Sequence, residues 1–249
     1  MEYFVRLTLY LSLIIPAFRE ATRIGPTLAK VHEYLSAQAY DCEVIVCDDG
    51  SPDETVEVVN REFASLPSVP NVHFHLVELG HNRGKGAAVQ AGMLAAEGQI
   101  RIFTDADLST PVYEVEKVIT AIENEHCDVV IGSRALEGRK LVKVHQPWYR
   151  EMMGRFFNLL VQLFVFSGIK DTQCGFKGFT ADAAKKLFRE QKVMGFSFDV
   201  DILYLAKKHG YRVKEVAVEW YNDERSTVGA LSDSSKMFFE ILRIRRLHK

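Results

Sequence analysis

Apolar residues in the first half of the chain gather in short runs, separated by stretches with the periodicity of amphipathic helices. Each run stops at a glycine, a proline or an acidic residue. Runs of this kind, alternating with helices, are typical of βαβ units, whose strands pair in parallel. The pattern therefore predicts an α/β fold with a mostly parallel central sheet flanked by helices. Five strands are expected: Leu7–Ile15, Glu43–Cys47, Val72–Leu79, Gln99–Thr104 and Asp128–Ile131.

Two helix starts can be read directly from the residues. Ser51-Pro52-Asp53-Glu54 has the residue types of a capping box, and Thr110-Pro111 places a proline at a first helical position. The second half is less regular, but no repeat or low-complexity linker divides it, so we expect one domain over residues 1–249. Its expected helices are Gln146–Gly168, Ala181–Glu190, Phe198–His209 and Ser232–His248, and its expected strands are Phe176–Thr180 and Tyr211–Trp220.

Composition limits the class of protein. Of the 249 residues, 47% are apolar and 26% charged, and the net charge is −2, which excludes a polybasic arm and predicts no nucleic-acid partner. The longest uncharged apolar stretch, Phe156–Ile169, has 14 residues, whereas a bilayer core requires about 20. No spanning helix and no signal peptide are expected. The four cysteines form no Cys-x-x-Cys pair, which favours reduced, buried thiols in a cytosolic protein.

Acidic residues follow the expected strands at their carboxyl ends, where open α/β sheets bind ligands. These residues are Glu20, Asp48, Asp49, Asp105 and Asp107. Carboxylates that converge repel one another unless a cation or hydrogen-bond donors compensate. Because Mg²⁺ typically takes one or two carboxylates together with substrate phosphates, the Asp-x-Asp pair is a candidate metal site. The alternative is that these aspartates only cap helices.

A glycine-rich basic turn, Asn82-Arg83-Gly84-Lys85-Gly86, is a second candidate ligand site. It is not a Walker A motif, since Ala87 stands where Ser or Thr is required, and Val89 replaces the third glycine of a dinucleotide fingerprint. We expect the turn to allow close approach to a nucleotide. A helix-start turn without a ligand is the alternative.

Together, these segments resemble the family 2 glycosyltransferases, which have the GT-A fold. The resemblance covers about residues 12–229. Its wider motifs are Ile14-Ile15-Pro16-Ala17-x-x-Glu20, Val46-Cys47-Asp48-Asp49-Gly50-Ser51, Asn82-x-Gly84-Lys85-Gly86 and Asp105-Ala106-Asp107. Further motifs resemble the dolichyl- or polyprenyl-phosphate sugar synthases, on the glucosyl rather than the mannosyl side: Asp105 to Pro111, Gly132-Ser133-Arg134, Asp171-Thr172-Gln173-Cys174-Gly175-Phe176-Lys177 and Phe198-Asp199-Val200-Asp201.

The resemblance implies a role for each matching residue. The nucleotide would be bound by Pro16, Ala17, Glu20, Asp48, Asp49, Arg83, Lys85 and Asp105. Asp105 and Asp107 would hold Mg²⁺ or Mn²⁺. The acceptor phosphate would be bound by Arg134, Arg150, Arg155, Gln173 and Lys177, and the catalytic set would be Asp105, Asp107, Arg134 and Asp201. Arg150 and Arg155 could instead be solvated surface residues. Asp201 stands where relatives often carry Glu, and could instead be a salt-bridge partner.

The activity implied by the resemblance is transfer of a sugar, with inversion, to a dolichyl or polyprenyl phosphate. The preferred donor is UDP-glucose, so the sugar is glucose. A phosphate monoester is already an anion at neutral pH, so it needs arginines more than a general base. GDP-mannose is the alternative donor. An acceptor with a glycan hydroxyl is another alternative, and it would require a base, for which Asp171, Asp199 and Asp201 are candidates. A scaffold without turnover would not need the acidic cluster, and the failed fingerprint excludes a Rossmann dehydrogenase.

Two stretches could bring the chain to a lipid. Residues 147–169 and 232–249 combine apolar side chains with basic ones, as helices that lie in a membrane interface do. We expect a protein bound peripherally at the cytosolic face of a membrane. Packing of both helices on the core, or a dimer contact, is the alternative, and the oligomeric state is left open.

Overall fold

The computed structural model describes residues 9–136, 158, 160–221 and 232–249, with the backbone alone for 232–238. Its centre is a seven-stranded sheet in the order β3-β2-β1-β4-β6-β5-β7. The strands are β1 Leu11–Ala17, β2 Cys42–Asp48, β3 Val72–Glu78, β4 Ile100–Thr104, β5 Val129–Ser133, β6 Phe176–Thr180 and β7 Val213–Ala217. Only β6 runs antiparallel to its neighbours, so the prediction of a mostly parallel sheet is confirmed.

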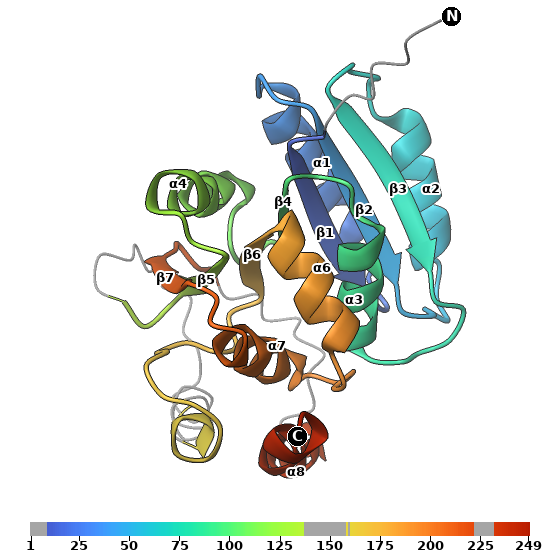
Figure 1. The fold of residues 1–249 in the computed structure, drawn as a ribbon. Helices are drawn as coiled ribbons and strands as arrows, with labels where there is room; N and C mark the ends of the chain where they lie inside the picture. Colours follow the sequence, from blue (N-terminus) through green and yellow to red (C-terminus); the bar gives the residue numbers. More distant parts are fainter. Residues whose placement is uncertain (1–8, 137–157, 159, 222–231) are drawn as a thin grey trace, which may run out of the picture.

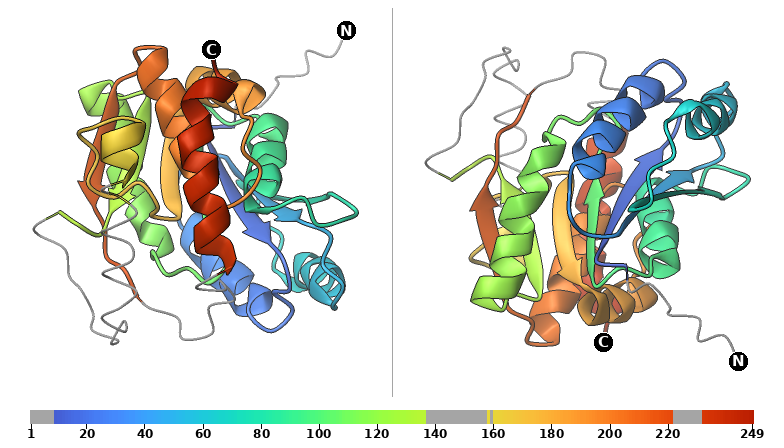
Figure 2. Two further views of the ribbon diagram at one scale, coloured as in Figure 1. Left: turned by 90° about the horizontal axis from the view of Figure 1, so that it is seen from below. Right: turned by 90° about the horizontal axis from the view of Figure 1, so that it is seen from above.

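Helices cover both faces of the sheet, which buries it on two sides (Figures 1 and 2). One core cluster packs α1, α2 and α4 against the sheet, and a second packs α3, α6 and α7 on the other face. The helices are α1 Ile24–Ser36, α2 Thr55–Ser65, α3 Lys85–Ala95, α4 Val115–Glu125 (after a 3-10 turn, Val112–Glu114), α6 Ala181–Glu190, α7 Phe198–Lys208 and α8 Ser232–Leu247. The four cysteines are free and buried, as predicted.

Beyond α7 lies an outer layer, which Figure 1 shows on the side of α7 away from the sheet. It consists of α8 and the helical residues 160–164. Ile241 and Ile244 of α8 pack with Val161, Val165 and Val200 in a small core of their own. Among the described residues, no helix is both long enough and apolar enough to cross a membrane.

Several local predictions differ from the structure. Pro111 is the N-cap of the 3-10 turn Val112–Glu114, not the first helical residue that we predicted. The strand expected at Tyr211–Trp220 is shorter, Val213–Ala217. The helix after β2 begins at Thr55, not at Ser51, so the capping-box prediction is wrong. The Ser51 hydroxyl instead accepts a hydrogen bond from the Arg19 backbone N–H at 3.0 Å, which links the loops that follow β1 and β2. The first strand also continues through Pro16 to Ala17. A proline is tolerated there because β1 pairs with β4 only as far as Ile14.

Candidate active site

The strand register brings the predicted residues to one edge of the sheet. Ala17 at the end of β1 lies beside Asp48 at the end of β2, and β4 ends at Thr104, directly before Asp105. Because β6 is antiparallel, its first residue, Phe176, lies opposite Thr104. The segment that leads into β6 therefore meets the carboxyl ends of the parallel strands, as expected for a ligand site in an α/β sheet.

Asp105 lies between a lysine and a glycine. Its Oδ1 accepts a hydrogen bond from Lys85 Nζ at 2.5 Å. A Cβ atom built on Gly175 would lie 1.9 Å from Asp105 Oδ2, so only glycine leaves room for this carboxylate. Gly175 of the Asp-Thr-Gln-Cys-Gly-Phe-Lys motif thus leaves open the space that the Asp105 carboxylate occupies.

Asp107 and Glu20 complete a group of neighbouring carboxylates. Burial raises the pKa of Asp107 and the charge of Asp105 raises it further, although a hydrogen bond from the Ser109 N–H at 2.8 Å opposes this. Burial also raises the pKa of Glu20, which accepts two hydrogen bonds of 2.6 Å from Arg23 and is influenced by both aspartates. Negative charge is therefore concentrated here beyond what Lys85 and Arg23 neutralise.

A divalent cation fits this arrangement if a substrate supplies the remaining ligands. Within the described residues, no three His, Cys, Asp or Glu side chains are arranged to hold a metal by themselves. Two carboxylates completed by phosphate oxygens are what Mg²⁺ or Mn²⁺ commonly uses at such sites. Asp105, which is paired with Lys85, and Asp107, whose pKa is raised by burial, are the residues that would hold the ion.

Asp48 and Asp49 have different tasks. Asp48 Oδ2 accepts a hydrogen bond from the Ser51 N–H at 2.9 Å, while Oδ1 is buried and has no partner among the described residues. An orphaned buried acceptor is costly unless a ligand satisfies it. Asp49 accepts hydrogen bonds from the backbone N–H groups of Arg83 at 2.7 Å and Gly84 at 2.8 Å, so it fixes the glycine-rich turn.

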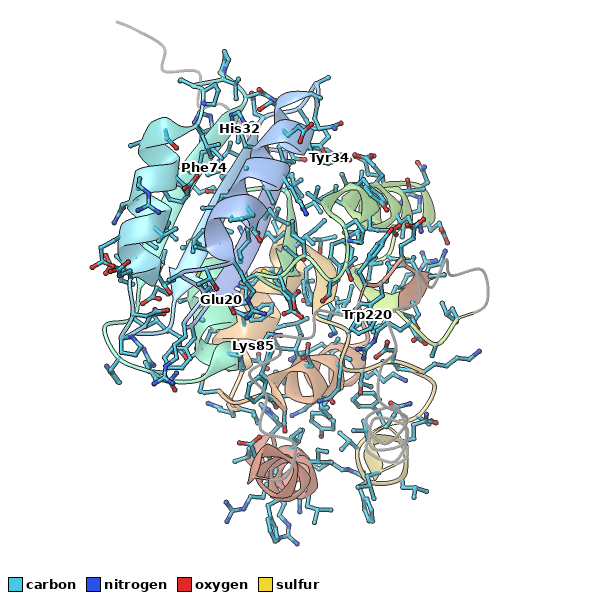
Figure 3. All side chains as sticks on the ribbon, turned by 180° about the vertical axis from the view of Figure 1, so that it is seen from behind. Glu20, His32, Tyr34, Phe74, Lys85 and Trp220 are labelled. Atoms are coloured by element: carbon cyan, nitrogen blue, oxygen red, sulfur yellow. The ribbon has the colours of Figure 1, made fainter. Side chains whose placement is uncertain are left out.

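The glycines of that turn serve packing. Gly84 has a φ of +104°, and a Cβ there would lie 2.5 Å from the Met194 carbonyl oxygen. A Cβ on Gly86 would lie 2.6 Å from Phe198 Cβ. Both glycines thus allow close contact with the segment before α7, while the approach of the turn to a nucleotide stays a prediction. Arg83 is exposed. Lys85, which Figure 3 labels, is half-buried and is bonded to Asp105.

Arg134 follows β5 and is held firmly. Its Nε and Nη2 donate to Asp171 Oδ2 and Oδ1 at 2.8 and 2.9 Å, and its guanidinium carbon lies 5.5 Å from the Trp220 ring centroid. Burial lowers the pKa of Arg134, but Asp171 outweighs it and leaves the pKa raised. Gln173 lies beside this pair, and its N–H donates to Asp171 Oδ1 at 3.3 Å.

Two predicted site residues point elsewhere. Lys177 is fully buried and donates to Asp199 Oδ1 and to the Cys174 carbonyl, both at 2.6 Å. Asp201 is also fully buried and accepts from His248 Nε2 at 2.5 Å and from the N–H groups of Lys192 and Val193. The structure therefore places Asp201 in a contact between α7 and the C-terminal helix, which matches the salt-bridge alternative. Arg150 and Arg155 lie outside the described residues.

Sequence reasoning missed two residues of this edge, Glu215 and Trp220. Both belong to the alternating run that predicted a strand at Tyr211–Trp220. β7 pairs in parallel with β5, so its carboxyl end reaches the same edge as Arg134. The rule that ligands bind at the carboxyl ends of strands, applied to this strand as to the others, would have drawn attention to Trp220.

Comparison with known proteins gives one family and many relatives. The model of Glycosyl transferase family 2 matches residues 12–188. A dolichyl-phosphate beta-glucosyltransferase of Trichomonas vaginalis is 38% identical, with 94% of this chain and 72% of the relative covered. Proteins of the same name from Dictyostelium discoideum and Homo sapiens are 35% and 31% identical, and cover 95% and 96% of this chain and 74% and 75% of their own length.

Solved structures share the fold at low sequence identity. Glucosyl-3-phosphoglycerate synthase from Mycobacterium tuberculosis, crystallised with Mn²⁺, UDP-glucose and phosphoglyceric acid, has a TM-score of 0.68 at 15% identity, over 96% of this chain and 80% of that one. Mannosyl-3-phosphoglycerate synthase from Rubrobacter xylanophilus has a TM-score of 0.67 at 18% identity, over 96% of this chain and 74% of that one. The expected GT-A fold is confirmed.

Proposed function

The chain belongs to glycosyl transferase family 2, and we propose that it transfers glucose from UDP-glucose to dolichyl phosphate with inversion at the anomeric carbon. The observation that carries the proposal is that relatives named for this activity match almost the whole chain, at 31–38% identity. The sheet edge that unites Asp105, Asp107 and Arg134 supports it from the side of chemistry, because it offers acidic and basic groups to the same reaction.

The donor would lie across the ends of β1, β2 and β4. Asp48, with a buried oxygen that has no partner in the described residues, is suited to accept a hydrogen bond from the base or the ribose. A Mg²⁺ or Mn²⁺ ion held by Asp105 and Asp107 would act as a Lewis acid toward the leaving diphosphate. Lys85 remains beside Asp105 as a second positive charge for the donor phosphates.

The acceptor phosphate would be bound by Arg134. A phosphate oxygen forms the new bond to the anomeric carbon while the bond from that carbon to the diphosphate oxygen breaks on the opposite face, so configuration inverts and UDP leaves. No proton needs to be removed from a dianionic phosphate. The ion pairs agree with an acceptor that needs no base. Asp171 is paired with Arg134 and Asp199 with Lys177, so neither aspartate is free to remove a proton from a hydroxyl acceptor.

We also propose that the protein acts peripherally at the cytosolic face of a membrane. The outer layer exposes large apolar side chains next to arginines, as interfacial helices do. Leu163 and Phe239 are 67% and 63% exposed, and Arg243, Arg245 and Arg246 are exposed on α8.

The test is a transfer assay with labelled UDP-glucose or GDP-mannose, with or without dolichyl phosphate, in Mg²⁺, Mn²⁺ or EDTA. We expect a lipid-linked product from UDP-glucose only, and only with metal and lipid phosphate. Asp107→Asn should lower turnover at least about a hundredfold, the scale of losing one strong electrostatic contact in a transition state. Asp182→Asn, an exposed aspartate beyond the opposite end of β6, is the matched control. Transfer from GDP-mannose, or unchanged turnover in Asp107→Asn, would contradict the proposal.

A further inference from the structure

Glu215, in the middle of β7, bonds to backbone N–H groups and has no cationic partner among the residues that the structure describes. Oε2 accepts a hydrogen bond from the Lys170 N–H at 2.8 Å, and Oε1 accepts one from the Asp171 N–H at 2.9 Å. Glu215 therefore binds two successive backbone N–H groups in the segment between the helical residues 160–164 and β6. Hydrogen bonds to a carboxylate are shorter and stronger than those between neutral groups, so these two bonds fix the backbone at residues 170–171.

Asp171 passes this constraint on to Arg134. It holds the arginine at three points, because Oδ2 also accepts from the Arg134 backbone N–H at 2.9 Å. The backbone N–H and the guanidinium of Arg134 are thus both hydrogen-bonded to one carboxylate, that of Asp171, which is itself buried. A shift of the 170–171 backbone would move Asp171 and, with it, the guanidinium.

The segment is held from its other side as well. Asn158 Nδ2 donates to the carbonyl oxygen of Lys170 at 2.8 Å, while Glu215 takes the N–H of the same residue. Trp220, which follows β7 and is labelled in Figure 3, covers one face of the Arg134 guanidinium. β7 and the residues that follow it therefore supply both the glutamate that holds the 170–171 backbone and the indole that lies against the guanidinium.

We propose that Glu215 is a positioning residue for the transfer reaction, which acts through Asp171 to aim Arg134 at the acceptor phosphate; this rests on the proposed function. Within the described residues, Asp171 takes two of the five N–H donors of the guanidinium, so the others remain for a phosphate. An arginine side chain is flexible when free, and holding it in one place lets it bind phosphate without first losing that freedom.

The test is Glu215→Gln, which replaces one carboxylate oxygen by an amide group that cannot accept from a peptide N–H. With acceptor and donor varied separately, we expect kcat/KM for dolichyl phosphate to fall about tenfold to a hundredfold, the range for a lost hydrogen bond to a charged group. KM for UDP-glucose should stay within about twofold. Glu125→Gln is the control. Glu125, the last residue of α4, pairs with Lys214, which directly precedes Glu215 on β7, and within the described residues it has no bond to the 170–171 backbone.

A double-variant comparison separates positioning from general damage. In an Arg134→Ala background, Glu215→Gln should cause no further loss in kcat/KM for the acceptor, because residues that act as one unit are not additive. Equal losses in both backgrounds, or equal effects on donor and acceptor, would overturn the inference. If Glu215→Gln does not fold, Glu215→Asp, which keeps the charge but draws the carboxylate back from the Lys170 and Asp171 N–H groups, should show the same acceptor-only loss.

A readout without turnover keeps this inference distinct from the proposed function. The ¹⁵N-labelled Nε–H of Arg134 should exchange slowly with solvent in the unaltered protein and in Glu125→Gln, and much faster in Glu215→Gln. Slow exchange in Glu215→Gln would refute the positioning role whatever the acceptor proves to be. Absence of any transfer by the unaltered protein would instead refute the dolichyl-phosphate function, and the exchange result would still decide the role of Glu215.

Discussion

Lys177 shows that residue type alone does not assign a binding role. A lysine in a motif beside an acidic cluster suggests phosphate binding, but strand register decides where its side chain goes. On β6, Lys177 lies between Phe103 of β4 and Ile131 of β5, in the middle of the sheet. Its ammonium is 5.5 Å from the Phe103 ring centroid and bonded to Asp199. Burial raises the pKa of Asp199, and Lys177 counteracts this.

We expect Lys177→Met to lower stability by about 3–5 kcal/mol, because it leaves Asp199 buried without this partner. The double variant Lys177→Met/Asp199→Leu should recover most of that loss, since it removes both charges and keeps similar volumes. Urea unfolding followed by circular dichroism measures both. The opposite result, unchanged stability with a raised KM for the acceptor, would support the predicted role of Lys177 in phosphate binding.

At the scale of elements, the turn before α3 shows that tertiary packing decides what a glycine near a helix start does. Gly86 and Gly25 are both the second residue of a helix, α3 and α1. The nearest atoms to a Cβ on Gly25 would belong to the flexible side chain of Glu62, the first at 3.3 Å. A Cβ on Gly86 would meet Phe198 Cβ at 2.6 Å and the Met194 carbonyl oxygen at 2.8 Å. The two glycines share a position in their helices, and tertiary packing gives them different surroundings.

Gly86→Ala should therefore destabilise the protein by about 1–3 kcal/mol, the cost of overpacking, although alanine is the better helix former. Gly25→Ala, the matched control, should be neutral or stabilising by up to about 1 kcal/mol. Thermal unfolding of the two variants side by side gives the comparison. Equal midpoints would show that the segment before α7 yields easily and does not set the position of the turn.

How far the sequence predicts the molecule depends on the range of the interactions. The strand Phe176–Thr180 and the helix Ala181–Glu190 were predicted with the bounds that the structure has, because their signals are local: in the structure, the Thr180 side chain caps the helix by accepting a hydrogen bond from the Ala183 N–H. The acidic residues were also placed at the ends of their strands, since the carboxyl ends of parallel strands must share one edge. Ser51 was misassigned because its hydroxyl is used by Arg19, on another loop.

Contacts between distant segments could not be predicted in this way. Asp201 meets His248 across 47 positions, and Glu215 meets Asp171 across 44. No local pattern records such pairs: a glutamate on an alternating strand ordinarily means a solvent-facing position. The same holds for Lys177 and Asp199, 22 positions apart. At this scale the fold itself, rather than a motif, decides which candidates form the site and which support it.

The whole molecule has a layered arrangement in which α7 separates the sheet from the outer helices (Figure 1). α8 buries Ile241 and Ile244 inward and exposes Phe239, Leu242 and Leu247. The dimer contact or core packing that we weighed as alternatives would have to cover these side chains. An anionic lipid surface suits them better, because arginines lie between the apolar positions of the same helix and would meet lipid headgroups.

The prediction is that the protein floats with vesicles containing phosphatidylserine and that Leu163→Ser/Phe239→Ser largely abolishes flotation. Each large apolar side chain contributes about 1.5–3 kcal/mol when it leaves water, so loss of two should reduce partitioning by at least about a hundredfold. Both residues are more than half exposed, and circular dichroism of the variant checks that the fold is retained. Leu94→Ser, which replaces a 38% exposed leucine on α3, is the matched control and should float as before.

Higher salt should weaken binding of the unaltered protein, because it screens the attraction between arginines and anionic lipid. Flotation of the double variant equal to that of Leu94→Ser would place the membrane contact on another surface of the molecule.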